Sequence, residues 1–372
     1  MSSNVRINNL EENEDTMKFT IENVNVSFIN AIRRVLLSDI PCIVMRSTPY
    51  SANLINISIN KTRLNNELLK QRISSVPIHV DDIENFPYAN YIVEVDKKNT
   101  SDTIEYCTTE DFKIKNIQSN EYLPIGEVRK IFPPDKITGD YIDIARLRPK
   151  LSSIVEEEHL KFTSKLSIGT ANDDGTFNVV STASYRNTLN ATKIKEVWET
   201  KLVDLKQKYS PEQIEFIRKD WLLLDAKRIY IENSFDFVLE TIGIYNNFKL
   251  MKYANEIIIK QLYLTLESLK NNSDFITNAT DILNNCFIIK LENQDYTVGK
   301  IIEFMLYDKY FIEKKELTYV GFIKKHPHDT NSIIKMAFNT LISKDEILTI
   351  LEDCINNSIV IINSIKEFFN ND

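Results

Sequence analysis

Two adjacent aspartates offer the sequence's clearest opportunity for metal chemistry. Asp173 and Asp174 lie in NDDG, residues 172–175, and two carboxylates could hold a magnesium ion for hydrolysis. An Asp-Gly pair between alternating strands is also the strongest short signal for a β-hairpin. The flanking alternation, Leu166/Ile168 before and Phe177/Val179 after, favours such a turn over a metal site.

The other metal-binding residue types lack a suitable spacing. His326 and His328 flank Pro327 with no third ligand nearby, which favours a loop. No two of the four cysteines form a C-x-x-C pair, so neither a disulfide framework nor a zinc knuckle is predicted. With seven glycines and no phosphate-binding glycine motif, the chain is expected to hold no metal and no cofactor.

A pair of arginines interrupts an apolar stretch, VSFINAIRRVLLSDIPCIV, residues 26–44. At 100° per residue a helix over 27–38 places one core-facing stripe on Phe28, Ile29, Ile32, Val35 and Leu36. A second face carries Asn30, Arg33, Arg34 and Leu37. This face is either an ordinary solvated surface or a binding surface, and the leucine within it is what raises the second interpretation.

Composition limits the class of protein. The chain has 372 residues, 43% of them hydrophobic, and a net charge of −8, which disfavours direct nucleic-acid binding by the chain as a whole. The densest basic cluster, IARLRPK with Arg146, Arg148 and Lys150, favours a solvated loop over a phosphate site. No apolar run approaches the roughly 20 residues of a membrane span, and no secretory signal is recognised, so an intracellular protein is expected.

The order of predicted elements occurs twice. Near the N-terminus, a strand at 17–24, the arginine helix, strands at 42–50 and 54–60, and a helix at 65–75 give β-α-β-β-α. Near the C-terminus, a strand at 286–293, a helix at 297–308, strands at 316–324 and 332–340, and a helix from 344 give the same order. Ser343 and Glu346 form a capping box for the last helix.

Two long amphipathic helices are expected to pack together. The last helix carries an apolar seam, interrupted at Ser358, that consists of Ile347, Leu351, Cys354, Ile361, Ile365 and Phe368. Residues 250–269 form a second helix of similar length. The sequence therefore predicts an α+β fold, with two β-α-β-β-α units joined as an internal pseudo-heterodimer. The expected domains are 1–84 plus 226–284, 285–372, and a mainly β domain with a charged helical segment inserted at 85–225; two unrelated α+β domains are the alternative.

The N-terminal motifs resemble those of the α-type assembly subunits of multisubunit RNA polymerases. The family's N-x-L-R-R helix followed by I-P corresponds to Asn30 to Arg34 and Ile40-Pro41. Its D-E-x-x-x-x-R-x-x-x-I-P block is similar to NELLKQRISSVP, with Asn66 in place of the aspartate. The residues that fit this block and two later ones, EEEHLKF and FDFVLETIG, are Glu67, Arg72, Pro77, His159, Glu240 and Gly243.

The C-terminal unit resembles the smaller partner subunit of that family. NQDYTVGK is similar to its E-D-H-T-L-G-N helix start, and YVGFIKKHPH to its A-G-Y-x-x-P-H-P. The corresponding residues are Asp295, Thr297, Gly299, Gly321, His326 and Pro327. A fusion of the two subunit types resembles the arrangement in large cytoplasmic DNA viruses.

The resemblance implies a non-catalytic subunit that nucleates assembly of the largest and second-largest polymerase subunits. The residues then expected at subunit interfaces are those of the second helix face, Asn30, Arg33, Arg34 and Leu37, and those matched to the later motifs, Glu67, Arg72, Pro77, His159, Glu240, Gly243, Asp295, Thr297, Gly299, Gly321, His326 and Pro327. Small zinc-binding polymerase subunits are further expected partners, DNA is contacted only through the complex, and no membrane is involved. A viral member would act in the host cytoplasm and could be packaged in the virion. An acidic-site metal-dependent hydrolase and a scaffold unrelated to transcription are the alternatives.

Overall fold

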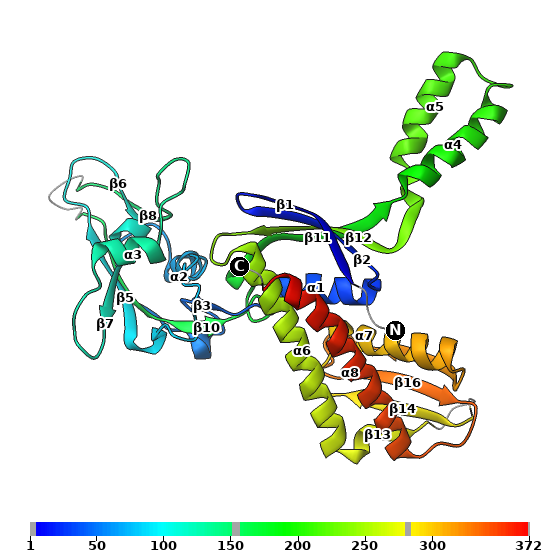
Figure 1. The fold of residues 1–372 in the computed structure, drawn as a ribbon. Helices are drawn as coiled ribbons and strands as arrows, with labels where there is room; N and C mark the ends of the chain where they lie inside the picture. The colour runs from blue at the N-terminus through cyan, green and yellow to red at the C-terminus, as the bar shows by residue number, and fades with distance from the viewer. Residues whose placement is uncertain (1–4, 151–156, 280–283, 371–372) are drawn as a thin grey trace. The chain divides into compact units, whose positions relative to one another are not determined.

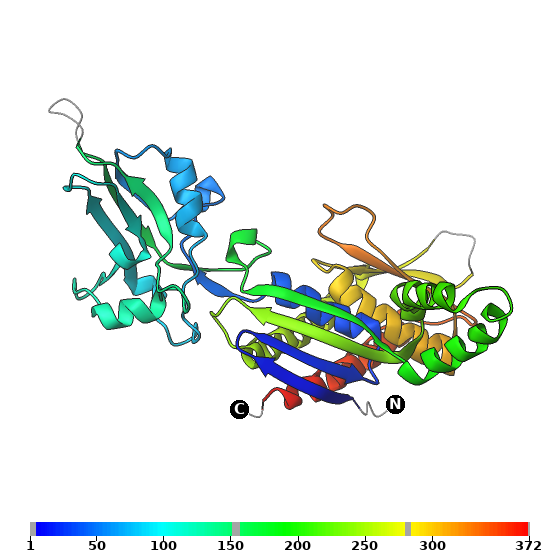
Figure 2. The same cartoon turned by 90° about the horizontal axis from the view of Figure 1, so that it is seen from above.

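The computed structural model describes residues 5–150, 157–279 and 284–370, which form an α+β fold (Figures 1 and 2). The chain divides into two compact units. The first contains residues 1–35, 182–240 and 251–372, and the second contains residues 36–181 and 241–250. This division differs from the predicted domains, because the first boundary falls inside the arginine helix rather than near residue 84.

The N-terminal part of the first unit is built on an antiparallel sheet. Met17, Phe19 and Ile21 alternate with more exposed residues along its second strand and are almost fully buried, as the period of a strand requires. The strand order is β1-β2-β12-β11. The elements of this part are β1 (Arg6–Asn13), β2 (Thr16–Glu22), α1 (Val26–Ser38), β11 (Val180–Leu189), β12 (Tyr230–Thr241) and α6 (Asn247–Asn271).

The C-terminal part of the same unit has a second four-stranded sheet, with the order β13-β14-β16-β15. The predicted order of strands and helices is confirmed here, and so is the Ser343–Glu346 capping box. The elements are β13 (Ile276–Asn278), β14 (Cys286–Leu291), α7 (Tyr296–Leu306) followed by a π-helical turn (Tyr307–Glu313), β15 (Leu317–Ile323), β16 (Ser332–Phe338) and α8 (Lys344–Phe368).

These two parts repeat one topology. Each part begins with an edge strand, followed by a second strand, a helix, two more strands and a long helix. In each sheet the edge strand pairs with the second strand, the second pairs with the fourth, and the third strand lies at the opposite edge. We call them repeat A (β1, β2, α1, β11, β12, α6) and repeat B (β13, β14, α7, β15, β16, α8). Figure 1 shows α6 and α8 as the long helices of the two repeats.

The two strands predicted to follow the arginine helix in the first β-α-β-β-α unit do form, but they do not belong to repeat A. The segments at 42–50 and 54–60 contain the strands β3 (Cys42–Val44) and β4 (Ile55–Asn60), which pair in the second unit with β10 (Ser167–Gly169) and β9 (His159–Lys165). The strands that complete repeat A are β11 and β12, far along the chain. Alternation identifies a strand and not its partner, so local pattern did not reveal this long-range pairing.

The second unit contains a four-stranded antiparallel sheet, ordered β4-β9-β5-β7, and two short strand pairs, β10-β3 and β6-β8. The helix predicted at 65–75 is confirmed as α2, and its N-cap is the Asn65 side chain. The remaining elements are α2 (Asn66–Ser74), β5 (Tyr91–Lys98), β6 (Glu105–Thr108), β7 (Lys113–Asn116), α3 (Ile125–Ile131), β8 (Asp143–Leu147), β9 (His159–Lys165) and β10 (Ser167–Gly169).

The NDDG stretch is not a hairpin turn, contrary to the prediction. The strand before it, β10, pairs with β3, whereas the strand after it, β11, joins the sheet of repeat A. The Asp174 side chain caps a short 3-10 helix, Gly175–Phe177, by accepting a hydrogen bond from the Thr176 amide. The local turn chemistry was recognised, but the flanking strands belong to different sheets.

The charged helical segment forms a helical hairpin between β11 and β12. Its helices are α4 (Ala191–Leu205) and α5 (Pro211–Leu223). The rings of Trp198 and Trp221 lie 5.3 Å apart between centroids and form a small core of their own. This hairpin belongs to the first unit and not to the inserted domain in which it was predicted. Among the described residues, no helix combines the length and apolar character needed to cross a bilayer.

Candidate subunit interface

The core-facing stripe of α1 is confirmed. Phe28, Ile29, Ile32, Val35 and Leu36 are each at most 2% exposed. On the second face, Asn30, Arg33, Arg34 and Leu37 are half-buried. The Arg33 Nε donates to the Asn30 Oδ1 at 3.0 Å, so these two predicted interface residues are joined on the helix surface.

Arg34 links the two repeats. Its Nε donates to the Thr297 Oγ1 at 3.0 Å, and its guanidinium forms an ion pair with Asp295. Asp295 is the N-cap of α7 and accepts a hydrogen bond from the Thr297 amide at 2.8 Å. Three residues that were predicted to face other subunits therefore meet one another inside the chain.

The same contacts set the ionisation of the Asp295 carboxyl. Burial alone would raise its pKa, but the Thr297 amide and the Arg34 charge together hold the pKa below its ordinary value. A carboxyl with a lowered folded-state pKa stabilises the fold above its ordinary pKa, and this contribution is lost as the pH falls through the lowered value.

Removing this link is expected to destabilise the first unit modestly. Because the two side chains are 34% and 38% exposed, we expect a coupling free energy of about 0.5–1 kcal/mol in a double-mutant cycle of Arg34→Ala and Asp295→Asn. Urea unfolding of the four proteins measures this quantity. The stability gap between the wild type and Asp295→Asn should close in acid, below the ordinary aspartate pKa; a gap independent of pH would contradict the assignment.

A close helix–sheet contact explains one predicted glycine. A Cβ atom on Gly299 of α7 would lie 1.9 Å from the Phe322 ring of β15, so any larger residue there would force the ring to move. A Cβ on Gly321 would lie 2.6 Å from the Tyr319 hydroxyl. Both glycines therefore pack repeat B internally, whatever else they contact.

The long helices of the two repeats are joined by a reciprocal pair of ion pairs. Glu256 of α6 pairs with Lys366 of α8 at 2.8 Å, and Lys270 of α6 pairs with Glu352 of α8 at 2.5 Å. In each helix the acid precedes the base by 14 residues. The early acid of each helix thus meets the late base of the other, which requires the two helices to run antiparallel.

The shorter helices also meet their counterparts. Phe28, near the start of α1, packs edge-on against Phe304, near the end of α7, with ring centroids 6.2 Å apart. Arg34, further along α1, reaches the start of α7 through Thr297. The pairs α1–α7 and α6–α8 therefore both join equivalent elements of the two repeats.

An aromatic contact adds a third connection between the repeats. Phe369, directly after α8, lies edge-on to Phe19 of β2 with centroids 5.4 Å apart, and Phe19 stacks on Phe237 of β12 at 5.3 Å. The predicted seam of α8 included Phe368 and Ile361, but Phe369 and Ile362 are the buried residues. Ser358 is also fully buried, so it continues the seam rather than interrupting it.

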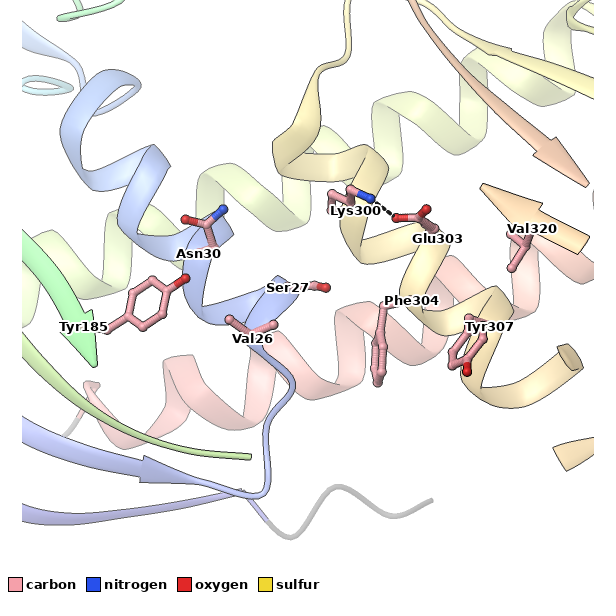
Figure 3. A pocket seen from close by; sticks show the side chains of 9 residues that line it. All are labelled: Val26, Ser27, Asn30, Tyr185, Lys300, Glu303, Phe304, Tyr307 and Val320. Atoms are coloured by element: carbon pink, nitrogen blue, oxygen red, sulfur yellow. Dashed lines mark hydrogen bonds and ion pairs between the residues drawn. The ribbon is translucent and has the colours of Figure 1, made fainter. Parts of the chain in front are cut away.

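A cavity of about 460 Å³ opens beside the α1–α7 contact (Figure 3). It adjoins Asn30, and Figure 3 shows its wall formed by α1, β11, α7 and the residues after α7. Two of its lining residues, Val26 and Tyr307, are 43% and 46% exposed. The lining residues are Val26, Ser27, Asn30, Tyr185, Lys300, Glu303, Phe304, Tyr307 and Val320.

The second unit contains six of the predicted interface residues: Leu37, Glu67, Arg72, Pro77, His159 and Gly243. Glu67 is exposed in the first turn of α2, Pro77 is half-buried, and Arg72 donates to the Asp143 carbonyl at 2.6 Å. His159 Nε2 lies 2.7 Å from the Asp96 carboxylate on the neighbouring strand.

The remaining predicted residues have local structural contacts. Gly243 adopts a φ of +96°, which favours glycine, and its carbonyl lies 3.1 Å from His79 Nδ1. Glu240 accepts a hydrogen bond from Thr182 at 2.9 Å. His326 and Pro327 lie in an exposed turn, where the His326 amide donates to Asp329 at 3.0 Å.

The candidate metal-site residues have other roles. Asp173 pairs with Arg46 at 3.0 Å, and Asp174 accepts from Thr48 as well as capping its helix. Within residues 5–150, 157–279 and 284–370, no group of three or more His, Cys, Asp or Glu side chains is placed to hold a metal ion. All four cysteines are buried, and burial raises the pKa of the Cys42, Cys107 and Cys354 thiols to about 12, so none of these three is a poised thiolate.

The cavity and the reciprocal ion pairs were not found from the sequence. The cavity depends on β11 being next to β12, which local pattern did not predict. A signal for the ion pairs was present, since an acid and a base spaced by 14 residues occur in both long helices. Comparing charge spacing between the two helices would have revealed it.

Two sheet-and-helix repeats of the same topology are joined through equivalent helices in this chain. Residues 18–262 match the family described as the RNA polymerase Rpb3/Rpb11 dimerisation domain, and the chain belongs to this family. The match begins within β2 and ends within α6, so it covers the second unit and most of repeat A, and the resemblance of repeat B to the smaller subunit stays a prediction.

Similar proteins are themselves polymerase subunits. The chain is 25% identical over 234 residues to subunit RPAC1 of DNA-directed RNA polymerases I and III from Homo sapiens, covering 57% of this chain and 62% of that protein. It is 27% identical over 100 residues to subunit 3B of RNA polymerases IV and V from Arabidopsis thaliana, covering 27% and 28%. It is 28% identical over 74 residues to subunit Rpo3 from Pyrococcus furiosus, covering 20% and 26%. The chain thus spans less than two thirds of these relatives.

Proposed function

We propose that this protein is a non-catalytic assembly platform of a DNA-dependent RNA polymerase, in which repeats A and B form an internal pseudo-heterodimer. The observation that carries the proposal is the reciprocal pairing of Glu256 with Lys366 and of Lys270 with Glu352. Reciprocal contacts between equivalent residues are the mark of a two-fold, isologous interface. Here the two sides of that interface belong to one chain.

Family membership supports the polymerase assignment, because the matched family is named for the dimerisation of two polymerase subunits. A fusion also favours pairing physically, since a covalent link replaces a bimolecular association by an intramolecular one. The alternative hydrolase has no comparable support, because Asp173 and Asp174 are used in local contacts.

The surface that we assign to a large polymerase subunit is the cavity between α1, β11 and α7. It combines exposed apolar side chains, Val26 and Tyr307, with the Lys300–Glu303 ion pair, which suits a protein interface with an apolar centre and a polar rim. In this proposal the largest and second-largest subunits are the principal partners, small zinc-binding subunits join them, and DNA is reached only through the complex. A viral origin with cytoplasmic transcription is the context in which such a fusion fits.

The test is assembly of the complex around a cavity variant. We expect Val26→Glu with Tyr307→Glu to leave the chain folded but to abolish co-purification of two chains of polymerase-core size, because two buried charges would lack partners in the interface. Affinity purification of the tagged chain from its native source, followed by mass spectrometry, measures this.

A matched control is available in the helical hairpin. Val203 and Tyr209 are 62% and 46% exposed, and Val203→Glu with Tyr209→Glu introduces the same charges on the same residue types. The control should assemble normally. If the cavity variant also assembles at physiological salt, the cavity is not the docking site; if the wild-type chain recovers no large polymerase subunits, the function itself is wrong.

A further inference from the structure

A second cavity, in the second unit, has an unusual concentration of arginine. It has a volume of about 320 Å³ and lies where α2 and the segment before it approach β8. Arg63, Arg72, Arg146 and Arg148 all line it, together with Asp143 and Glu158. In a chain with a net charge of −8, this is a local excess of two positive charges.

The four guanidinium groups are not equally occupied. Arg148 donates from its Nε to the Glu158 carboxylate at 2.6 Å, and Glu158 is only 5% exposed, so this pair is structural. Arg72 donates to a neutral acceptor, the Asp143 carbonyl, and its charge is therefore not neutralised by that bond. The Arg63 and Arg146 side chains are exposed, and their guanidinium groups have no hydrogen bond or ion pair with any part of the chain that the structure describes.

The rim of the cavity includes Tyr106, and an exposed aliphatic residue directly precedes each of the two strands beside it. Tyr106 lies directly across the β6–β8 pair from Arg146 and is 50% exposed. Ile104, immediately before β6, is 49% exposed, and Ile142, immediately before β8, is 44% exposed. Tyrosine and arginine beside exposed aliphatic side chains are the composition of a protein-binding surface.

We propose that this cavity binds an acidic segment of a partner protein, in which carboxylates alternate with aliphatic residues. The planar fork of arginine matches a carboxylate with two parallel hydrogen bonds, and the aliphatic residues of the segment cover Tyr106, Ile104 and Ile142. A nucleic acid is disfavoured, because its backbone needs a basic track and the chain as a whole repels it. The inference goes beyond the assembly function and is tested without other polymerase subunits.

The test uses the full chain and a fluorescein-labelled peptide of alternating glutamate and leucine. We expect saturable binding by fluorescence anisotropy, weakened about tenfold or more by Arg63→Ala with Arg146→Ala. Both arginines are exposed and unpaired within the described chain, so the variant should melt at the wild-type temperature. Tyr106→Ala, which removes rim area without changing charge, should also weaken binding.

The matched control is Lys113→Ala with Lys130→Ala, which removes the same charge from exposed positions of the same unit outside the cavity. It should bind the peptide like the wild type. Absence of peptide binding, or equal weakening by both double variants, would overturn the proposal. So would tighter binding of a labelled oligothymidine than of the peptide, lost in the Arg63/Arg146 variant, since that result would assign the cavity to nucleic acid.

Discussion

Replacing Ile32 by aspartate should unfold the first unit. Ile32 is 2% exposed in the stripe by which α1 packs against its neighbours. A carboxylate there has no partner and loses its hydration, so the variant should lose at least about 4 kcal/mol of unfolding free energy. Because domains of this size are typically stable by about 5–15 kcal/mol, such a loss leaves little folded protein. Urea unfolding followed by circular dichroism measures the change.

A control for Ile32→Asp lies two residues earlier on the same helix. Asn30 is half-buried, and its side-chain oxygen accepts from Arg33, a role that an aspartate can also fill. Asn30→Asp should therefore change the free energy of unfolding by no more than about 0.5 kcal/mol. If the two variants were equally stable, α1 would not be packed as the structure shows.

Replacing Phe369 by alanine should cost about 3–5 kcal/mol, although the residue lies next to the C-terminus. Its ring is 2% exposed and contacts Phe19, so the substitution leaves a cavity between repeat B and the sheet of repeat A. Thermal unfolding of the first unit should shift accordingly. The expected loss is large because the contact joins two parts of the chain that are distant in sequence.

The adjacent residue supplies a matched control for Phe369→Ala. Phe368 has the same side chain but is 39% exposed, so Phe368→Ala should cost much less, about 1 kcal/mol or below. A reversed order of the two effects would mean that the seam of α8 follows the register predicted from sequence. In that case the contact between Phe369 and Phe19 would not form in solution.

Much of the secondary structure could be read from local pattern. The capping box of α8, the apolar stripe of α1 and the alternation of β2 each depend on residues close in sequence, and each was confirmed. The sequence did not predict which strands pair with one another. β3 and β4 look like the strands that should follow α1, but they pair in the second unit, and repeat A is completed by β11 and β12.

In the candidate site, too, the sequence identified the residues but not the residues that they contact. The sequence singled out Arg34, Asp295 and Thr297 separately, by their resemblance to family motifs, and assigned each to an external interface. The structure joins them to one another. An arginine off a core stripe indicates that some acceptor faces it, but the identity of that acceptor depends on the packing of a helix more than 250 residues away.

The reciprocal ion pairs of α6 and α8 have a consequence for the evolution of the sequence. In a symmetric homodimer, one substitution at such a helix alters both ends of the interface at once. Here the Glu256–Lys366 and Lys270–Glu352 pairs are encoded separately, so a substitution can change one ion pair while the other stays the same. If the charge of one residue is reversed, only a reversed charge on its partner in the other repeat restores that ion pair. Because both repeats belong to one chain, the two ends of the α6–α8 contact can differ in sequence.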